Sequence, residues 1–228
     1  MQTEISLYIH IPFCTKKCPY CHFYVLPDKD PFKQQLLTAL ELEWRAINPK
    51  LEGKNVVSIY FGGGTPSLMG SSGIGKILEW LSHSEDAEIT LEANPENISL
   101  KLMQEMRSIG INRVSIGVQT LDNALLKRLG RTHTAQDAMR AIEMTAEAGI
   151  ENISIDLMYE LPEQTVSSWE KTLHQLQPLP ISHLSLYNLT FEPHTVFYKK
   201  QKELIPLLPS SVECLEMLNI ATNYLPEI

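Results

Sequence analysis

Three of the four cysteines, Cys14, Cys18 and Cys21, lie within eight residues, and this stretch is the part of the chain best suited to chemistry. The spacing C-x3-C-x2-C puts three thiolates on one short loop, where they could hold three irons of a cubane iron–sulfur cluster. Because such clusters usually have four cysteine ligands, three would leave one iron open to a small molecule.

Two other uses of these cysteines are compatible with the spacing. Zinc prefers four nitrogen or sulfur ligands in a tetrahedron, and His10 or His22 could supply the fourth. A disulfide would leave an odd thiol among the three. Residues outside the loop must therefore decide between a cluster, zinc and a disulfide.

Composition limits the classes of function. The chain has 228 residues, 43% of them hydrophobic, and a formal net charge of -8. With 19 Lys and Arg against 27 Asp and Glu, no nucleic-acid-binding face is indicated. No apolar run is long enough to cross a membrane, so we expect no integral membrane protein. The absence of a secretory signal pattern and the clustered thiols predict a cytoplasmic location.

Strand-like and helix-like stretches alternate along the chain. Strands are expected at 6–11, 56–61, 87–93, 113–119, 152–159 and 182–189, and helices at 30–47, 72–82, 100–109, 134–149, 166–176 and 211–224. Asp30 is the expected N-cap of the first helix, and Thr134 with Asp137 forms a capping-box pattern. Six strand–helix units predict a parallel sheet. Because a closed eight-unit barrel needs about 250 residues, we expect an α/β fold with an open three-quarter (β/α)6 barrel.

The last predicted helix, 211–224, has an apolar face. That face comprises Val212, Leu215, Leu218 and Ala221, and Cys214 lies on the same side. The pattern predicts that these side chains are buried and that Cys214 is a core residue.

Polar residues collect where the predicted strands end. After the cysteine loop come Gly62–Gly64 with Thr65, then Glu92 with Asn94, Gln119, Asp156, and finally Tyr187, Asn188 and Thr190. In parallel barrels the reacting groups lie at the carboxyl ends of the strands. The sequence therefore predicts one site on one rim of the barrel.

Several of these residues have a competing structural interpretation. The glycines could let the backbone approach a ligand, or simply form a turn. A buried carboxylate needs a partner, and for Glu92 this is either a ligand or a salt bridge with Arg113 on a neighbouring strand. For Asp156 the alternative is a core aspartate that caps backbone N–H groups.

Gln119 and Arg131 offer complementary binding chemistry. Gln119 could hydrogen-bond an adenine or a carboxylate, or be an ordinary polar residue at the barrel mouth. Arg131 could hold a carboxylate with two hydrogen bonds, or be a solvated loop residue. His10 and His133 are each isolated in the sequence, and we expect them to have structural roles.

In order along the chain, these motifs resemble one branch of the radical S-adenosylmethionine (SAM) proteins. They are Tyr8-x-His-Ile-Pro-Phe-Cys with Cys-x-Tyr-Cys, Gly-Gly-Gly-Thr-Pro, Glu-x-Asn-Pro, Ser-Ile-Gly-Val-Gln, Arg-x-His and Asp-Leu-Met-Tyr-x-Leu-Pro, within residues 5 to 200. That branch contains the oxygen-independent coproporphyrinogen III dehydrogenases, or oxidases, and the HemW heme chaperones.

The resemblance implies cofactors and residues that bind them. Cys14, Cys18 and Cys21 resemble the ligands of a [4Fe-4S] cluster whose fourth iron is open to SAM. Tyr20 resembles the aromatic residue that packs on SAM, and Tyr8 a tyrosine beside it. The remaining SAM-binding positions implied by the resemblance are Gly63, Gly64, Thr65, Glu92, Gln119, Arg131 and Asp156.

Two departures from the dehydrogenase pattern resemble the HemW side of the branch. Phe23 stands where a fourth motif cysteine is expected, and only 13 residues precede Cys14. The resemblance then implies heme or a porphyrin as a ligand, a hemoprotein acceptor, and an electron donor if SAM is cleaved. A dehydrogenase that decarboxylates two propionates and a zinc-stabilised binding module are the alternatives.

The family continues into a C-terminal domain with a His-Asn-x-x-Tyr-Trp heme motif that this sequence lacks. We therefore expect a barrel over residues 1–200 and, over 201–228, the helical start of a truncated C-terminal region. Heme binding is implied by the resemblance alone.

Overall fold

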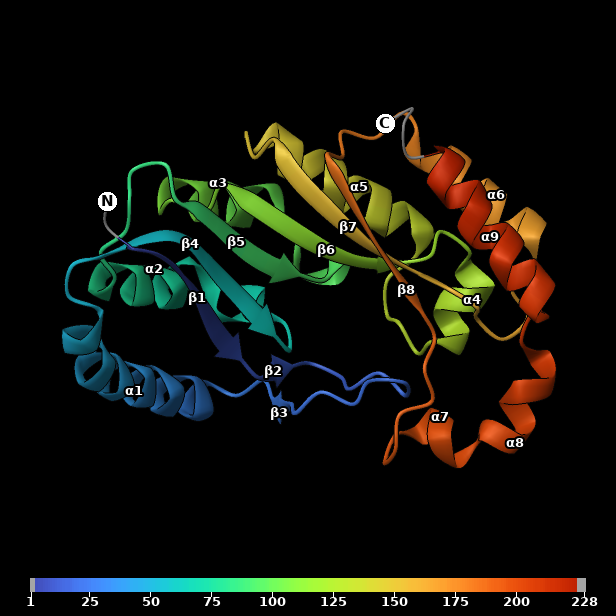
Figure 1. Cartoon of the computed structure of the whole chain (residues 1–228), viewed down its shortest axis with the longest axis horizontal. Helices are drawn as coiled ribbons and strands as arrows, with labels where there is room; N and C mark the ends of the chain where they lie inside the picture. The colour runs from blue at the N-terminus through green and yellow to red at the C-terminus, as the bar shows by residue number, and fades with distance from the viewer. Residues whose placement is uncertain (1–2, 225–228) are drawn as a thin grey trace.

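A six-stranded parallel sheet forms the centre of the computed structural model, which describes residues 3–224. Its strand order is β1 (Thr3–Ile11), β4 (Lys54–Gly63), β5 (Glu88–Ala93), β6 (Arg113–Gln119), β7 (Asn152–Tyr159) and β8 (His183–Asn188). The sheet curls, but no ladder joins β1 to β8 among the described residues (Figure 1). The predicted open (β/α)6 barrel is therefore confirmed. A small separate ladder pairs β2 (Phe13–Cys14) with β3 (Leu26–Pro27).

Helices between successive strands cover the convex side of the sheet (Figure 1). They are α1 (Asp30–Ile47), α2 (Gly70–Trp80), α3 (Leu100–Ser108), α5 (Ala135–Glu147) and α6 (Val166–Leu176), and the short α4 (Asn123–Arg128) also lies between β6 and β7 in the chain. Three helices follow β8: α7 (Val196–Lys199), α8 (Gln201–Leu204) and α9 (Ser211–Tyr224). Of these, α9 packs on α6. Short 3-10 turns span Asn48–Leu51, Pro66–Met69, Pro95–Asn97 and Ile205–Leu207.

Strand alternation separates the core from the hollow of the barrel. Ile9 and Leu7 on β1 pack against the core, whereas Tyr8 and His10 between and beside them do not. Successive side chains of a strand point to opposite faces. One face of the sheet therefore meets the helices, and the other lines the open interior.

The predicted elements lie close to their expected positions, with a few corrections. Strands 113–119 and 152–159 and helices 30–47, 166–176 and 211–224 have the expected bounds, and the capping box of Thr134 and Asp137 is present. The N-cap of α1 is Lys29, not Asp30, and no side chain caps this end. Short helices α4, α7 and α8 were not predicted.

The predicted buried face of α9 is wrong for three of its four residues. Val212, Leu215 and Leu218 are 76%, 59% and 38% exposed, whereas Ala221 is buried as expected, together with Met217. Trp169 of α6 donates its indole N–H to the Met217 carbonyl at 2.8 Å and so fixes how α9 lies on α6. Cys214 is only partly buried and is not a core residue. Apolar residues occur on several sides of α9, so periodicity did not identify the packed side.

No single helix within residues 3–224 is long and apolar enough to cross a membrane. Two neighbouring helical segments, Gln201–Leu207 and Ser211–Tyr224, are long and apolar enough only when they are counted together, and the chain bends by 66° between them.

Candidate cofactor site

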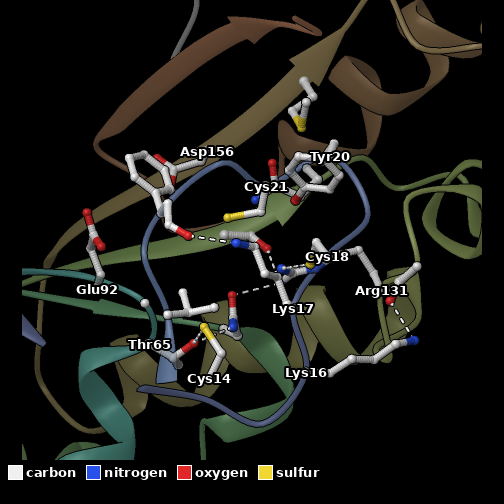
Figure 2. A pocket seen from close by; sticks show the side chains of 18 of the residues that line it. Cys14, Lys16, Lys17, Cys18, Tyr20, Cys21, Thr65, Glu92, Arg131 and Asp156 are labelled. Carbon is white, nitrogen blue, oxygen red and sulfur yellow. Dashed lines mark hydrogen bonds between the residues drawn. The ribbon is translucent and has the colours of Figure 1, made fainter. Parts of the chain in front are cut away.

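A cavity of about 390 Å³ opens at the carboxyl ends of the strands. Every predicted site residue except Tyr8 lines it. In Figure 2, Glu92 and Asp156 lie on one side of the cysteines and Arg131 lies on the other. The volume is within the range of small-molecule sites, and the predicted rim residues line this one cavity.

Three free thiols share this cavity. Cys14 ends β2, and the loop then turns tightly so that the Cys21 N–H donates to the Cys18 carbonyl at 3.1 Å. Burial raises the pKa of Cys14 and of Cys21, and the charge of the other cysteines raises it further. Thiolates that repel one another in a partly buried loop are stabilised by bound metal, so this donor set suits an iron–sulfur cluster.

The two histidines considered as a fourth zinc ligand have other neighbours in this structure. Within the described part of the chain, no three His, Cys, Asp or Glu side chains meet closely enough to hold one metal ion. His10 Nδ1 instead lies 3.0 Å from the Tyr8 hydroxyl, and the His22 ring stacks on Phe23. A cubane binds its ligands at separate corners and accepts thiols that are further apart.

Arg131 is a buried cation beside the cysteines. Its side chain is 6% exposed, and its Nη1 donates to Cys18 Sγ at 3.6 Å while Nη2 donates to the Gly117 carbonyl at 2.9 Å. Burial alone would lower the pKa of Arg131, but Tyr20, Cys18 and Glu96 together raise it. Arg131 is therefore not a solvated loop residue, and its positive charge would balance that of a thiolate-bound cluster.

Asn94 and Thr65 connect this cation to the first cysteine. The Asn94 carbonyl accepts from Arg131 Nη2 at 2.7 Å, and its amide donates to Thr65 Oγ1 at 3.0 Å. Thr65 Oγ1 in turn lies 3.6 Å from Cys14 Sγ. A continuous polar chain thus runs from Cys14 to Cys18 through three other side chains.

Glu96 forms an ion pair with Arg131 at 3.8 Å and is itself bonded to His133. His133 is buried, with Nδ1 3.2 Å from Glu96 Oε2 and Nε2 3.2 Å from the Val118 carbonyl. Although burial would raise the pKa of Glu96, the His133 hydrogen bond and the Arg131 charge lower it to about 2. The structural role expected of His133 is confirmed.

Close packing explains two of the predicted glycines. A Cβ on Gly63 would lie 2.6 Å from the His10 ring, and one on Gly64 would lie 2.6 Å from the Phe13 carbonyl. Their amide N–H groups donate to Glu92 Oε2 and to the Ile11 carbonyl, at 3.0 and 2.8 Å. These two N–H groups are therefore already hydrogen-bonded within the protein.

Glu92 is held by its neighbours without a salt bridge. Tyr60 donates its hydroxyl to Oε1 at 2.8 Å, and the Gly63 N–H donates to Oε2. The alternative partner Arg113 contacts only Thr90 Oγ1, at 3.4 Å, among the residues described. The carboxylate is fixed in position yet remains at the cavity wall.

Asp156 is a carboxyl group with an unusual pKa. Burial and the nearby charge of Glu92 raise this pKa to about 6, and the Ser115 hydroxyl lies 3.2 Å from Oδ1. A hydroxyl donor and a carboxyl group that can accept hydrogen bonds suit the hydroxyl groups of a polar ligand.

The other predicted residues have separate positions. Tyr20 is packed against Phe197, with ring centroids 6.2 Å apart, and burial raises the pKa of its phenol. Gln119 lines the cavity in the left-handed region, with φ 69°. Tyr8 lies on edge strand β1, 60% exposed and stacked on Tyr60 at 6.1 Å.

Sequence reasoning missed the residues that hold this site from outside. Tyr60, Glu96 and Ser115 each bond a predicted site residue or its partner. Tyr60 and Ser115 could have been found from strand alternation. Each lies an even number of residues before a predicted site residue on the same strand, so both side chains point to the same face of the sheet. Nothing in the sequence pairs Glu96 with His133 across 37 positions.

Comparisons with known proteins assign the fold to one superfamily. The Radical SAM superfamily model matches residues 8–176. This chain belongs to the radical SAM superfamily, which implies a [4Fe-4S] cluster and SAM as cofactors.

Particular relatives narrow the resemblance. The heme chaperone HemW of Lactococcus lactis is 37% identical over 92% of this chain and 55% of its own length. HemW of Escherichia coli is 39% identical over 90% and 54%. The solved structure of coproporphyrinogen III oxidase (HemN) from Escherichia coli, a radical SAM enzyme, has a TM-score of 0.88 at 31% identity, covering 99% of this chain and 53% of its own. The chain thus spans about half the length of these proteins.

Proposed function

We propose that this chain is the cofactor-binding barrel of a HemW-type heme chaperone. The observation that carries the proposal is the convergence of three free cysteines, a buried arginine and two carboxyl groups on one cavity. The identity with HemW proteins over nearly the whole chain supports heme as the cargo and hemoproteins as acceptors.

Each part of the cavity has a role in this proposal. Cys14, Cys18 and Cys21 hold the [4Fe-4S] cluster, while Arg131 and Thr65 hydrogen-bond two of the sulfurs. Glu92, Gln119 and Asp156 bind the polar groups of SAM, and Tyr20 packs against it. A reduced cluster held by these cysteines would supply the electron if SAM is cleaved, chemistry that belongs to the cofactors.

The second candidate is a coproporphyrinogen III dehydrogenase, favoured by the close fold match to the Escherichia coli oxidase. Phe23 argues against it, because this exposed side chain occupies the position of the fourth motif cysteine. Porphyrinogen turnover with release of CO2 under anaerobic reduction would favour the dehydrogenase.

Anaerobic reconstitution with iron and sulfide tests the cluster and SAM. We expect an EPR signal of a reduced [4Fe-4S] cluster that changes when SAM is added. Cys18→Ala should abolish it, whereas Cys214→Ala should keep it, because Cys214 lies on α9 outside the cavity. A colourless protein with one zinc would refute the proposal.

Heme handling needs its own measurement. The reconstituted chain, loaded with hemin, is mixed with an apo-hemoprotein, and the Soret band of the acceptor is followed. Transfer faster than from free hemin supports the chaperone function. Failure to bind hemin would remove the heme assignment and leave the cluster and SAM assignment standing.

The division of the chain remains part of the proposal. We assign residues 1–200 to the barrel unit and residues 201–228 to a separate C-terminal region. The hydrogen bond between Trp169 of α6 and Met217 of α9 attaches the start of this region to the barrel.

A further inference from the structure

The concave face of the barrel is polar between the cofactor cavity and the amino ends of the strands. Its inward positions include Ser6, Tyr60, Thr90, Arg113, Ser115 and Ser185. The hydroxyls of Ser58 and Ser6 are 2.7 Å apart, which shows that side chains of neighbouring strands lie side by side on this surface. Closed parallel barrels fill this space with apolar side chains. This open barrel instead offers a polar hollow.

Arg113 is the group in this hollow whose charge is not balanced by a direct contact. It is part-buried, its one hydrogen bond is to Thr90 Oγ1 at 3.4 Å, and no carboxylate of residues 3–224 lies within 4.0 Å of it. The charge of Arg113 is near enough to lower the pKa of Asp156, but Glu92 and Asp156 accept their hydrogen bonds from Tyr60 and Ser115. A guanidinium has five N–H donors, so most of those of Arg113 remain for a ligand.

A second cavity surrounds Arg113 at the lower end of the hollow. Its lining also includes Tyr60, Glu88, Glu151 and His183. Glu88 accepts a hydrogen bond from Thr90, and Glu151 is exposed in the segment before β7. Since neither forms an ion pair with Arg113, the guanidinium is open to a planar acid that can accept two parallel hydrogen bonds.

Two tyrosines flank the open side of the barrel. Tyr8 on β1 and Tyr187 on β8 are 60% and 55% exposed, and β1 and β8 are the two edges of the sheet. Exposed aromatic faces suit a flat ring system. Along β6, Arg113 is four residues from Gly117 at the rim, which is about 13 Å at the rise of a strand. A ring held near the rim must therefore extend an acidic arm along the hollow to reach Arg113.

We propose that the hollow binds a planar ligand bearing carboxylates, with its ring between Tyr8 and Tyr187 and one carboxylate on Arg113. This inference rests on the proposed heme function and gives the tetrapyrrole a location and an anchor within the barrel. It assigns Arg113 as the residue that distinguishes acids from their neutral esters.

A pair of metal-free porphyrins tests the anchor. The reconstituted chain is titrated with protoporphyrin IX and with its dimethyl ester, following Soret absorbance and protein fluorescence. We expect the diacid to bind at least tenfold more tightly than the ester. Arg113→Gln should remove this difference by weakening the diacid alone, whereas Tyr8→Ala should weaken both ligands equally.

Arg140→Gln is the matched control, because Arg140 is an exposed arginine on the outer helix α5. Equal loss of both ligands in Arg113→Gln, or an unchanged diacid affinity, would overturn the inference. The SAM-dependent EPR change should persist in Arg113→Gln. If the wild-type chain shows no SAM-dependent EPR change, the cofactor proposal is refuted instead, so the two failures are distinguishable.

Discussion

The side-chain carbonyl of Asn94 accepts a hydrogen bond from Arg131 Nη2 at 2.7 Å, which joins the buried cation to the Thr65 hydroxyl on the opposite side of the cysteine loop. Through this amide the two hydrogen bonds that reach Cys18 and Cys14 are parts of one network. Because hydrogen bonds to cluster sulfurs influence its potential, Asn94 is placed to affect the cluster without touching it.

Asn94→Ala should therefore make the cluster harder to reduce. Without the amide, Arg131 and Thr65 lose their orientation, and fewer donors stabilise the more negative reduced state. We expect the midpoint potential to fall by about 59 mV, a tenfold change in a one-electron equilibrium. EPR-monitored redox titration measures the shift, with exposed Asn219→Ala on α9 as the control. An unchanged potential would show that the network is only structural.

Gly64→Ala should prevent cluster assembly. The added Cβ would lie 2.6 Å from the Phe13 carbonyl, so β2 and the adjoining Cys14 must move. Gly75→Ala is the matched control, because a Cβ there makes ordinary contacts at 3.7 Å and α2 should gain about 0.5–1 kcal/mol. Iron and sulfide per chain after reconstitution distinguish the two variants.

The sheet and most of the site could be predicted because both follow local rules. Apolar runs between turn signals identified all six strands of the sheet, and the end of each strand identified its rim residues. The cysteine spacing needed no tertiary information. Residues such as Gln119 and Asp156 reached one cavity because parallel strands bring their carboxyl ends together.

What escaped prediction depends on contacts between distant residues. Nothing local distinguishes Arg131 as a buried cation, since burial comes from Asn94, Glu96 and the Cys18 loop. The packed side of α9 was likewise decided by Trp169, 48 residues before Met217. Periodicity reports which side of an element is apolar, and not which neighbour will cover it.

The corrected face of α9 gives a stability prediction. Met217→Ala removes a fully buried side chain and should cost about 2–5 kcal/mol of unfolding free energy. Leu215→Ala removes a side chain that is 59% exposed and should cost less than about 1 kcal/mol. Urea denaturation of both variants tests this, and a larger loss for Leu215→Ala than for Met217→Ala would show that Leu215 is on the packed side.

The Glu96 pair predicts a loss of stability in acid. Its pKa is about 2 in the folded chain, against 4.5 ordinarily, so its contribution is present above pH 4.5 and is lost as the pH falls toward 2. Because the residue is partly solvated, we expect only about 1 kcal/mol. Glu96→Gln should show this loss at pH 7 and a flatter acid limb in thermal melts. Glu143→Gln, an exposed change on α5, should match the wild type.

Asp156 should show the opposite dependence. Its pKa is raised to about 6 from 3.8, so the ionised carboxylate destabilises the folded chain above pH 6, and protonation relieves this as the pH falls toward 4. Asp156→Asn should therefore stabilise the cofactor-free chain by about 2 kcal/mol at pH 8, with the difference shrinking near pH 4. The same variant should bind SAM more weakly, because the carboxyl faces the cofactor cavity. Thermal melts across this pH range, together with SAM titration of the reconstituted chain, test both effects. A variant that is less stable at pH 8 would show that the hydrogen bond with Ser115 outweighs the burial and the repulsion by Glu92.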